Sequence, residues 1–251
     1  MNAFFSDLDH TLIYSHRIRI PGPKVPVERL DGKEQSYMTQ EAWSFFRTAG
    51  WLSLIPVTTR SEAQYRRLQF PEDFHIRYAL VCNGGKLLAD GAEDREWSER
   101  TMELVREDLP ELEELGKRLG ELCGQEVHAP ERYYYYVKTA EPERICGALE
   151  RGNRKGRIRI SHDHGKVYLF PQNVCKGTAV RRFAEKYEIN VSAGAGDSIM
   201  DIPMLEAVDF PLAPASVCGK LRHPNAGKLA GEILSDQICR ALEALHRTGK
   251  F

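Results

Sequence analysis

Phe4-Phe5-Ser6-Asp7-Leu8-Asp9-His10-Thr11-Leu12 is an apolar run that ends abruptly in two carboxylates. Apolar side chains favour burial, whereas a carboxylate needs water, a cation or a proton. Both needs are met at the carboxyl end of a parallel strand, where open α/β sheets form their ligand crevice. The run therefore predicts a short buried strand over residues 3–7 that brings Asp7 and Asp9 to such a crevice.

A second run of this kind lies near the other end of the chain, at Gly194-Ala195-Gly196-Asp197-Ser198-Ile199-Met200-Asp201. It also begins with small or apolar residues and then supplies two carboxylates. Four carboxylates that meet at one sheet edge would repel one another strongly. A hard divalent cation with a preference for oxygen ligands relieves this repulsion. The two runs together predict a site for Mg²⁺.

Four short motifs, in this order along the chain, resemble those of the haloacid dehalogenase (HAD) superfamily of phosphohydrolases. They are Asp7-x-Asp9-x-Thr11, Thr58 after the apolar run 52–57, Lys176 in Lys176-Gly177-Thr178-Ala179, and Gly196-Asp197-x-x-x-Asp201. Each motif alone is weak, because Asp-x-Asp also occurs by chance and in EF-hands. Their common order from about Phe4 to Leu212 makes the resemblance specific.

A fifth feature narrows the resemblance to one branch of this superfamily. Asn83-Gly84-Gly85 resembles a step of the Cof-type branch, which also includes sucrose-phosphate and mannosylglycerate-phosphate phosphatases. Two positions depart from the usual family pattern. Thr59 stands where many members have glycine, and Met200 stands where they often have asparagine.

The resemblance implies an α/β fold: a Rossmann-like core with a parallel sheet and an inserted α+β cap domain of the C2 type. We expect the core to comprise residues 1–86 and 172–251, and the cap to comprise residues 87–171. The segment 15–38 contains three prolines and Asp31-Gly32, which exclude a helix and favour a hairpin. It corresponds to an enlarged form of the small flap that follows the first motif in this family.

Hydrophobic periodicity and capping residues predict the other elements. In the core we expect a helix from a Thr39 N-cap to Gly50, strands at 52–57 and 78–82, helices at 61–69, 176–187 and 231–246, and a strand at 191–196. In the cap we expect helical structure at 99–123 and 142–151, a strand at 132–138, and a hairpin around Asp163-His164-Gly165.

Catalytic roles follow from the resemblance, residue by residue. Asp7 would be the nucleophile that forms an acyl-phosphate, and Asp9 the general acid and then the general base. Thr58 and Lys176 would bind the phosphoryl oxygens. The metal ligands would be Asp7, Asp9 through its main-chain carbonyl, Asp197 and Asp201. The substrate-binding residues would be Thr11, Thr59, Arg60, Asn83 and Gly84.

The leading interpretation is a Mg²⁺-dependent phosphomonoesterase that acts through an aspartyl-phosphate on a small phosphorylated metabolite, most plausibly a sugar phosphate. Two alternatives stay open. A phosphomutase or phosphotransferase of the phosphomannomutase type would differ only in what accepts the phosphoryl group from Asp7. A catalytically weak phosphate-binding regulatory protein is the alternative from another class, and the departures at Thr59 and Met200 are its only support.

Composition limits the location and the partners. The 251 residues are 42% hydrophobic and 28% charged, with a formal net charge of −1, which gives no reason to expect nucleic acid or an anionic membrane as a partner. The sequence has no 18-residue apolar run and no basic-then-apolar start. Its 6 cysteines are scattered without a C-x-x-C pair, as in a reducing compartment. We therefore expect a cytoplasmic protein, and its oligomeric state does not follow from the sequence.

Three further features have both a functional and a structural explanation. His162-x-His164 has the spacing of metal ligands, but the tip of a hairpin explains it more simply. The four tyrosines at 133–136 would stack a sugar or base only two at a time, because alternate strand residues face opposite sides. Arg17, Arg19 and Lys24 are expected on the flap, where they are either a solvated surface or contacts for an anionic substrate.

Overall fold

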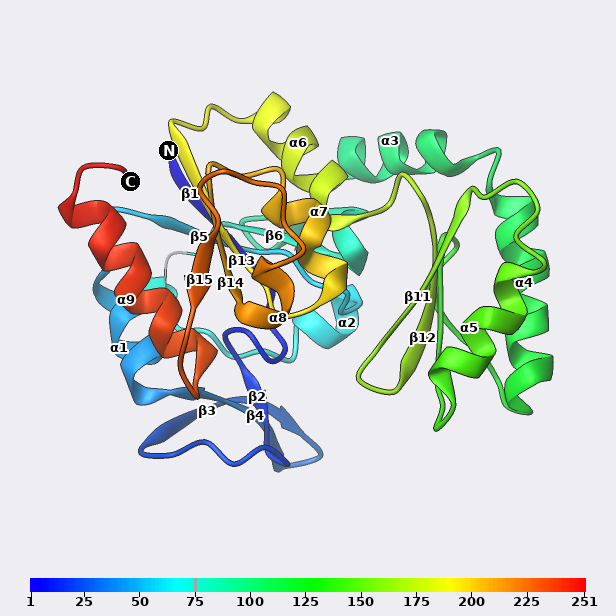
Figure 1. Ribbon diagram of the computed structural model, residues 1–251, viewed down its shortest axis with the longest axis horizontal. Helices are drawn as coiled ribbons and strands as arrows, with labels where there is room; N and C mark the ends of the chain where they lie inside the picture. Colours follow the sequence, from blue (N-terminus) through cyan, green and yellow to red (C-terminus); the bar gives the residue numbers. More distant parts are fainter. Residues whose placement is uncertain (75) are drawn as a thin grey trace. The chain divides into compact units, whose positions relative to one another are not determined.

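A computed structural model describes residues 1–74 and 76–251 of the chain. The chain forms two compact units, Met1–Asp94 with Lys176–Phe251, and Arg95–Cys175 (Figure 1). The sequence predicted the inserted domain at residues 87–171, whereas the second compact unit begins at Arg95 and ends at Cys175. Strand β7 (Lys86–Ala89) pairs with β6 (Tyr78–Val81), so the residues after 86 continue a sheet of the first unit.

A five-stranded parallel sheet forms the centre of the first unit. Its strands, in spatial order, are β15 (Gly227–Leu229), β14 (Phe210–Pro214), β13 (Val191–Ala195), β1 (Asn2–Ser6) and β5 (Ser53–Pro56). Every neighbouring pair is parallel. Strands β14 and β15 were not predicted, whereas the parallel α/β core was. Pro56 lies in β5, which is an edge strand of this sheet, and a residue without an N–H is tolerated on an edge strand.

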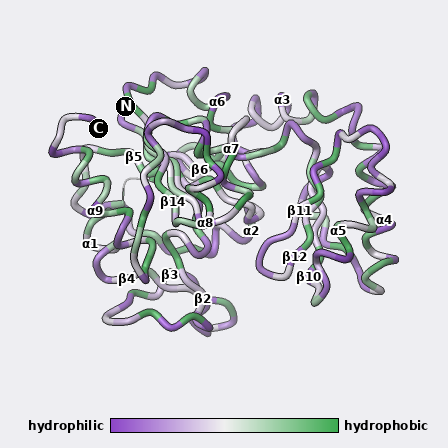
Figure 2. The backbone as a smooth tube through the Cα atoms, viewed as in Figure 1, coloured by the Kyte–Doolittle hydropathy of each residue, from purple (hydrophilic) through white to green (hydrophobic). Residues whose placement is uncertain are grey.

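Both faces of this sheet are covered, which explains why β1 is apolar at consecutive positions. Phe4 stacks on Phe46 of α1 (Gln40–Thr48), in a cluster that also includes residues of α9 (Leu234–Arg247). Phe5 points to the other face and meets the edge of Phe183 from α6 (Lys176–Lys186). Figure 1 shows α1 and α9 together on one side of the sheet, and Figure 2 shows hydrophobic and hydrophilic residues alternating along α9.

The segment after the first carboxylates forms a small antiparallel sheet, as expected for an enlarged flap. Its strands are β2 (Tyr14–Ser15), β3 (Lys24–Leu30) and β4 (Lys33–Thr39), in the order β2-β4-β3. Asp31 and Gly32 form the tight turn with φ of 51° and 74°, the left-handed conformations that this type of hairpin turn requires. Thr39 caps α1, and its side chain accepts the N–H of Ala42.

The helix expected at 61–69 is much shorter in the structure, where α2 spans only Glu62–Tyr65. The following residues leave the helix because they pair with the flap. Leu68 forms a β-bridge with Glu28, and the N–H of Gln69 donates to the carbonyl of Val27. The remaining short elements of this unit are β8 (Ala92–Glu93), α7 (Ile202–Leu205), α8 (Ala215–Cys218), and 3-10 helices at Glu72–Phe74, Cys82–Gly84 and Ile199–Asp201.

The second unit is an α+β fold around an antiparallel sheet in the order β11-β12-β10-β9. The strands are β9 (His128–Glu131), β10 (Tyr134–Lys138), β11 (Ile158–Asp163) and β12 (Lys166–Pro171), and the helices are α3 (Arg95–Val105), α4 (Leu109–Cys123) and α5 (Pro142–Glu150). The helical stretch predicted at 99–123 is thus two helices. The break lies just before Pro110, which occupies the first turn of α4, where its missing N–H has no cost.

The tyrosine run divides between the two faces of this second sheet. Tyr134 and Tyr136 share one face, where their rings lie near those of Tyr168 and Phe170. Tyr135 points to the other face, against Gly116 of α4. His162 and His164 belong to no described group of three or more potential metal ligands. In the described part of the chain, no helix has both the length and the apolar character needed to span a membrane.

Candidate active site

The pairing of β1 with β13 brings together the two acidic runs, which lie far apart in the sequence. Ser6 is opposite Ala195 in the parallel ladder, and the N–H of Asp7 donates to the Ala195 carbonyl at 2.9 Å. Asp7 therefore begins where β1 ends, and Gly196 and Asp197 begin where β13 ends. Both runs leave the sheet at the same edge, as the sequence predicted.

Three carboxylates and one ammonium group meet at this edge. Asp7, Asp197 and Asp201 each place one oxygen within 4.8 Å of the others. Lys176 Nζ donates to Asp7 Oδ1 at 2.6 Å and to Asp201 Oδ1 at 2.5 Å. The Thr11 hydroxyl lies 3.0 Å from Asp197 Oδ1 and 3.4 Å from Asp7 Oδ2, so it can donate to one of them at a time.

The charges of this cluster do not balance. With all three carboxylates ionised, a single ammonium would leave two negative charges uncompensated, and Asp7, Asp201 and Lys176 are all buried. Burial raises the pKa of Asp7 well above its ordinary value, although the charge of Lys176 opposes this. Burial alone would lower the pKa of Lys176, but Asp201 and Asp7 raise it, so the ammonium form is strongly held. A divalent cation fits both the missing charge and the oxygen donors.

Backbone amides orient Asp201, whose side chain is fully buried (0% exposed). Its Oδ2 accepts the N–H of Asp197 at 3.1 Å and that of Ser198 at 3.0 Å. Ser198 Oγ in turn accepts the N–H of Met200 at 3.2 Å. These bonds are independent of the side chain at position 200, so the orientation of Asp201 does not need an asparagine there.

Two glycines allow the cluster to close, and the sequence analysis assigned neither of them a role. A Cβ at Gly196 would lie 2.3 Å from Cβ and 2.4 Å from Cγ of Asp201. A Cβ at Gly177, next to Lys176, would lie 2.1 Å from the carbonyl oxygen of Pro203. Both glycines occur inside motifs quoted above, but only the folded chain shows what they approach.

We expect Gly196→Ala to lower turnover by about tenfold or more, because the new methyl group displaces the Asp201 carboxylate from Lys176. The effect would be measured on the turnover that the motif resemblance predicts, as steady-state release of phosphate. Gly50→Ala is the matched control, since a Cβ there has nothing within 4 Å. Normal activity of a folded Gly196→Ala variant would show that the position of Asp201 does not matter.

Asp9 has partners different from those of the three-carboxylate cluster. Arg60 Nε donates to its Oδ2 and Arg60 Nη2 to its Oδ1, both at 2.8 Å, which is a bidentate ion pair. Arg60 Nη2 also donates to Glu28 of the flap at 3.0 Å. Glu28 was not predicted to belong to the site, because an acidic residue in a predicted hairpin resembles ordinary surface. The proposed ligation of a metal by the Asp9 carbonyl remains a prediction.

The loop after β5 is held by the turn that contains the Asn-Gly-Gly step. Thr58 is buried, its N–H donates to the Leu80 carbonyl, and its hydroxyl accepts the N–H of Arg60. The N–H of Asn83 donates to the Thr58 carbonyl at 2.8 Å. Asn83 and Gly84 have φ of 58° and 86°, and Thr59 lies half-buried between Thr58 and Arg60. Roles of these residues in substrate binding remain predictions.

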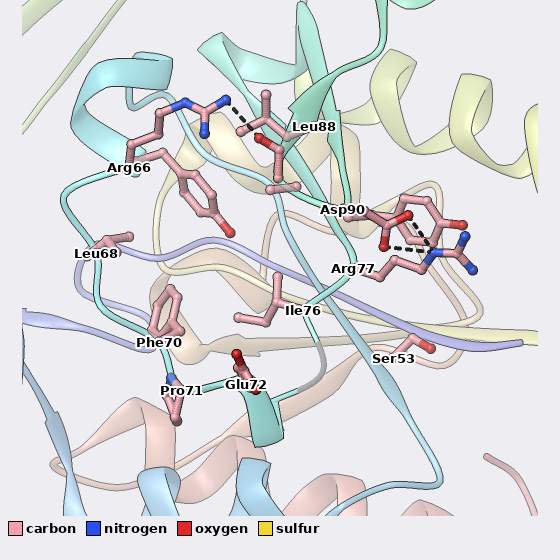
Figure 3. A pocket seen from close by; sticks show the side chains of 14 residues that line it. Ser53, Arg66, Leu68, Phe70, Pro71, Glu72, Ile76, Arg77, Leu88 and Asp90 are labelled. Atoms are coloured by element: carbon pink, nitrogen blue, oxygen red, sulfur yellow. Dashed lines mark hydrogen bonds and ion pairs between the residues drawn. The ribbon is translucent and has the colours of Figure 1, made fainter.

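The first unit also contains a pocket of about 920 Å³ at some distance from the carboxylates (Figure 3). It is lined by residues such as Ser53, Ile76 and Leu88, near the amino ends of β5 and β6. Arg66 donates to the Gly91 carbonyl beside it, and Arg77 pairs with Asp90 (Figure 3). The site residues named above are absent from its lining, so it is not the predicted crevice.

Comparison with known proteins yields structural matches only. No family model matches the sequence, and no curated protein matches it significantly. A sucrose-phosphatase from Synechocystis, solved with sucrose and phosphate, is similar with a TM-score of 0.62, 14% identity and coverage of 99% of this chain and 98% of that one. A sugar phosphatase of HAD subclass IIB is similar with a TM-score of 0.60 and 14% identity, and the match covers 100% of both chains. The C-terminal domain of C. albicans trehalose-6-phosphate phosphatase is similar with a TM-score of 0.60 and 12% identity. That match covers 97% of this chain and 91% of the other.

The fold defined above is thus a parallel α/β core interrupted by an α+β unit. More specifically, it is the fold of the HAD-superfamily phosphatases, over the whole length of the chain. The resemblance inferred from the short motifs and the structural likeness agree on this fold. Because the identities are below 25%, the likeness by itself concerns the fold, and the activity is argued from the site.

Proposed function

We propose that this chain is a Mg²⁺-dependent phosphomonoesterase of the cytoplasm that hydrolyses a small phosphorylated metabolite. One observation carries the proposal. The Asp7 carboxylate lies at the end of β1, bonded to Lys176 and grouped with Asp197 and Asp201. This arrangement combines a nucleophile, a fixed positive charge and a set of oxygen donors at one point.

In the first proposed step, a carboxylate oxygen of Asp7 attacks phosphorus and the ester P–O bond breaks. The departing oxygen takes the proton of the Asp9 carboxyl group, so the products are an aspartyl-phosphate and an alcohol. In the second step, Asp9 removes a proton from water while the water oxygen attacks phosphorus. The bond from Asp7 to phosphorus then breaks, which releases inorganic phosphate and leaves Asp9 protonated again.

Other residues would supply charge and position. The Lys176 ammonium neutralises the phosphoryl oxygens as charge spreads over them, and the Thr58 hydroxyl donates to one of them. Asp7, Asp197, Asp201 and the Asp9 carbonyl would hold the metal ion. When bound, Mg²⁺ would offset the repulsion between the carboxylates and the phosphate dianion. The unit Arg95–Cys175 would act as the C2-type cap that selects the substrate.

A sugar phosphate is the proposed substrate class. Proteins with this fold are described as a sucrose-phosphatase, a sugar phosphatase and a trehalose-6-phosphate phosphatase. Transfer of the phosphoryl group to a second sugar would use the same first step. The site contains the full set of charged groups, which argues against a purely regulatory phosphate-binding role.

A screen of phosphorylated sugars and other metabolites, with and without Mg²⁺, tests the proposal. We expect release of inorganic phosphate from at least one sugar phosphate, and only when Mg²⁺ is present. Isomerised sugar phosphate without free phosphate would indicate a phosphomutase. No turnover of any ester, including generic aryl phosphates, would refute the proposed activity.

A further inference from the structure

A buried acid on the flap, Glu28, has no part in the proposed chemistry described so far. It is only 3% exposed. Its Oε2 accepts the Ser36 hydroxyl at 2.6 Å and Arg60 Nη2 at 3.0 Å, and its Oε1 accepts Arg67 Nε at 3.0 Å. A carboxylate is costly to bury, so a group with this many partners is specifically accommodated.

An irregularity in the flap turns Glu28 inward. Alternate residues of a strand face opposite sides, yet Val27 and Glu28 are both buried. The β3–β4 ladder shifts register on both sides of Glu28, between Pro26 and Glu28 and again before Arg29. Such bulges re-aim side chains and are frequent beside active sites. The bridge from Glu28 to Leu68 holds the bulged strand from its other edge.

Arg60 links this buried acid to Asp9. Its side chain is 11% exposed, and its Nη2 donates both to Asp9 Oδ1 and to Glu28 Oε2. Two arginines, Arg60 and Arg67, thus face the carboxylates of Asp9 and Glu28. The two positive and two negative charges balance. Burial raises the pKa of Glu28, but the hydrogen bonds and charges of Arg60, with help from Ser36 and Arg67, lower it overall. The lowered pKa favours the anionic form of Glu28, whose oxygen accepts the hydrogen bond from the Arg60 guanidinium.

We propose that Glu28 is a positioning residue for proton transfer: it fixes Arg60, which fixes the Asp9 carboxylate, so that the flap determines how well the leaving group is protonated. Both oxygens of Asp9 are bound by Arg60 in this structure. The first proposed step uses the protonated form of Asp9, so one oxygen must leave Arg60 and take a proton before it can donate that proton to the leaving group. Because Glu28 shares Nη2 with Asp9, it keeps the guanidinium in place while Asp9 turns. This inference rests on the proposed phosphatase function and concerns one step of it.

The test compares two esters that differ in their need for a proton. The 4-nitrophenolate of 4-nitrophenyl phosphate leaves without protonation, whereas the phenolate of phenyl phosphate is a poorer leaving group that gains from a general acid. The quantity measured is kcat/KM, which includes the step that breaks the ester bond. We expect Glu28→Gln to lower kcat/KM for phenyl phosphate about tenfold more than for 4-nitrophenyl phosphate.

Glu34→Gln is the matched control. Glu34 lies on the same hairpin and also pairs with an arginine, Arg29, but it has neither contact with Arg60 nor full burial. For Glu34→Gln, the ratio of kcat/KM for phenyl phosphate to kcat/KM for 4-nitrophenyl phosphate should equal that of the wild type. Ser36→Ala is a second variant, because it removes the 2.6 Å bond to the Glu28 oxygen that binds Arg60. It should shift the ratio in the same direction as Glu28→Gln, and it decides the test if Glu28→Gln does not fold.

Equal losses on both esters, or no loss on either, in a folded variant would overturn the role of Glu28 while the phosphatase activity stands. A wild-type protein that cleaves neither these two esters nor any sugar phosphate of the screen would reject the proposed function itself, and this inference with it. A selective loss on phenyl phosphate would support the coupling of the flap to Asp9.

Discussion

Asp7→Asn should reduce kcat by at least about 10³-fold, which corresponds to about 4 kcal/mol of lost transition-state stabilisation. The amide keeps the shape of the carboxylate but lacks the charge that attacks phosphorus. Steady-state release of phosphate from the best substrate of the screen measures the effect. The variant should also fail to accumulate a covalent phospho-enzyme in a rapid acid quench.

Asp209→Asn is the control for this substitution. Asp209 accepts bonds from the N–H and hydroxyl of Ser192, at the opposite end of β13 from the carboxylate cluster. It should retain full turnover. The fold of Asp7→Asn should survive, because the change removes one of three mutually repelling carboxylates. If Asp7→Asn kept a tenth of the wild-type activity, Asp7 would not be the nucleophile.

Removal of divalent metal should abolish turnover, and added Mg²⁺ should restore it. The expectation rests on the two uncompensated negative charges of the cluster and on its oxygen donors. Mg²⁺ should also raise the melting temperature, because a ligand that binds only the folded state stabilises it. Asp197→Asn retains an acceptor for Thr11 but removes one charge, so it should require about tenfold or more Mg²⁺ for half-maximal activity.

The shift in melting temperature separates metal binding from catalysis. It should be lost or much reduced in Asp197→Asn and unchanged in Asp209→Asn. Full activity of the wild type in the presence of a chelator, with no metal detected in the protein, would contradict the proposed site. An unchanged melting temperature at saturating Mg²⁺ would contradict it independently.

Much of the fold could be predicted because its signals are local. The apolar side chains of the run at Phe4-Phe5 favour burial, so the run predicts a short buried strand. Asp31-Gly32 adopts left-handed conformations without strain, so it predicts the hairpin turn. Thr39 offers a hydroxyl to the first amides of a helix, so it predicts where α1 begins. In each case the cause lies within a few residues of the effect.

The elements that were wrong or missed depend on distant partners. The segment after Tyr65 has helical periodicity, but Leu68 and Gln69 bond to β3 instead of continuing the helix. Strand β15 spans only Gly227–Leu229, too few residues for a clear pattern, and exists because β14 offers it a ladder. Local propensity is a weak preference that such tertiary pairings override.

The chain alone therefore determined which residue types end the central strands: Asp7 and Asp9 after one, Asp197 and Asp201 after another. Only the tertiary structure decided which of these four carboxylates cluster together and which one lies apart. Asp7, Asp197 and Asp201 gather around Lys176, while Asp9 turns to Arg60 and, through it, to Glu28. The physical reason is that β1 and β13 are adjacent in the sheet although most of the chain separates them, and that a bulge in β3 aims Glu28 inward.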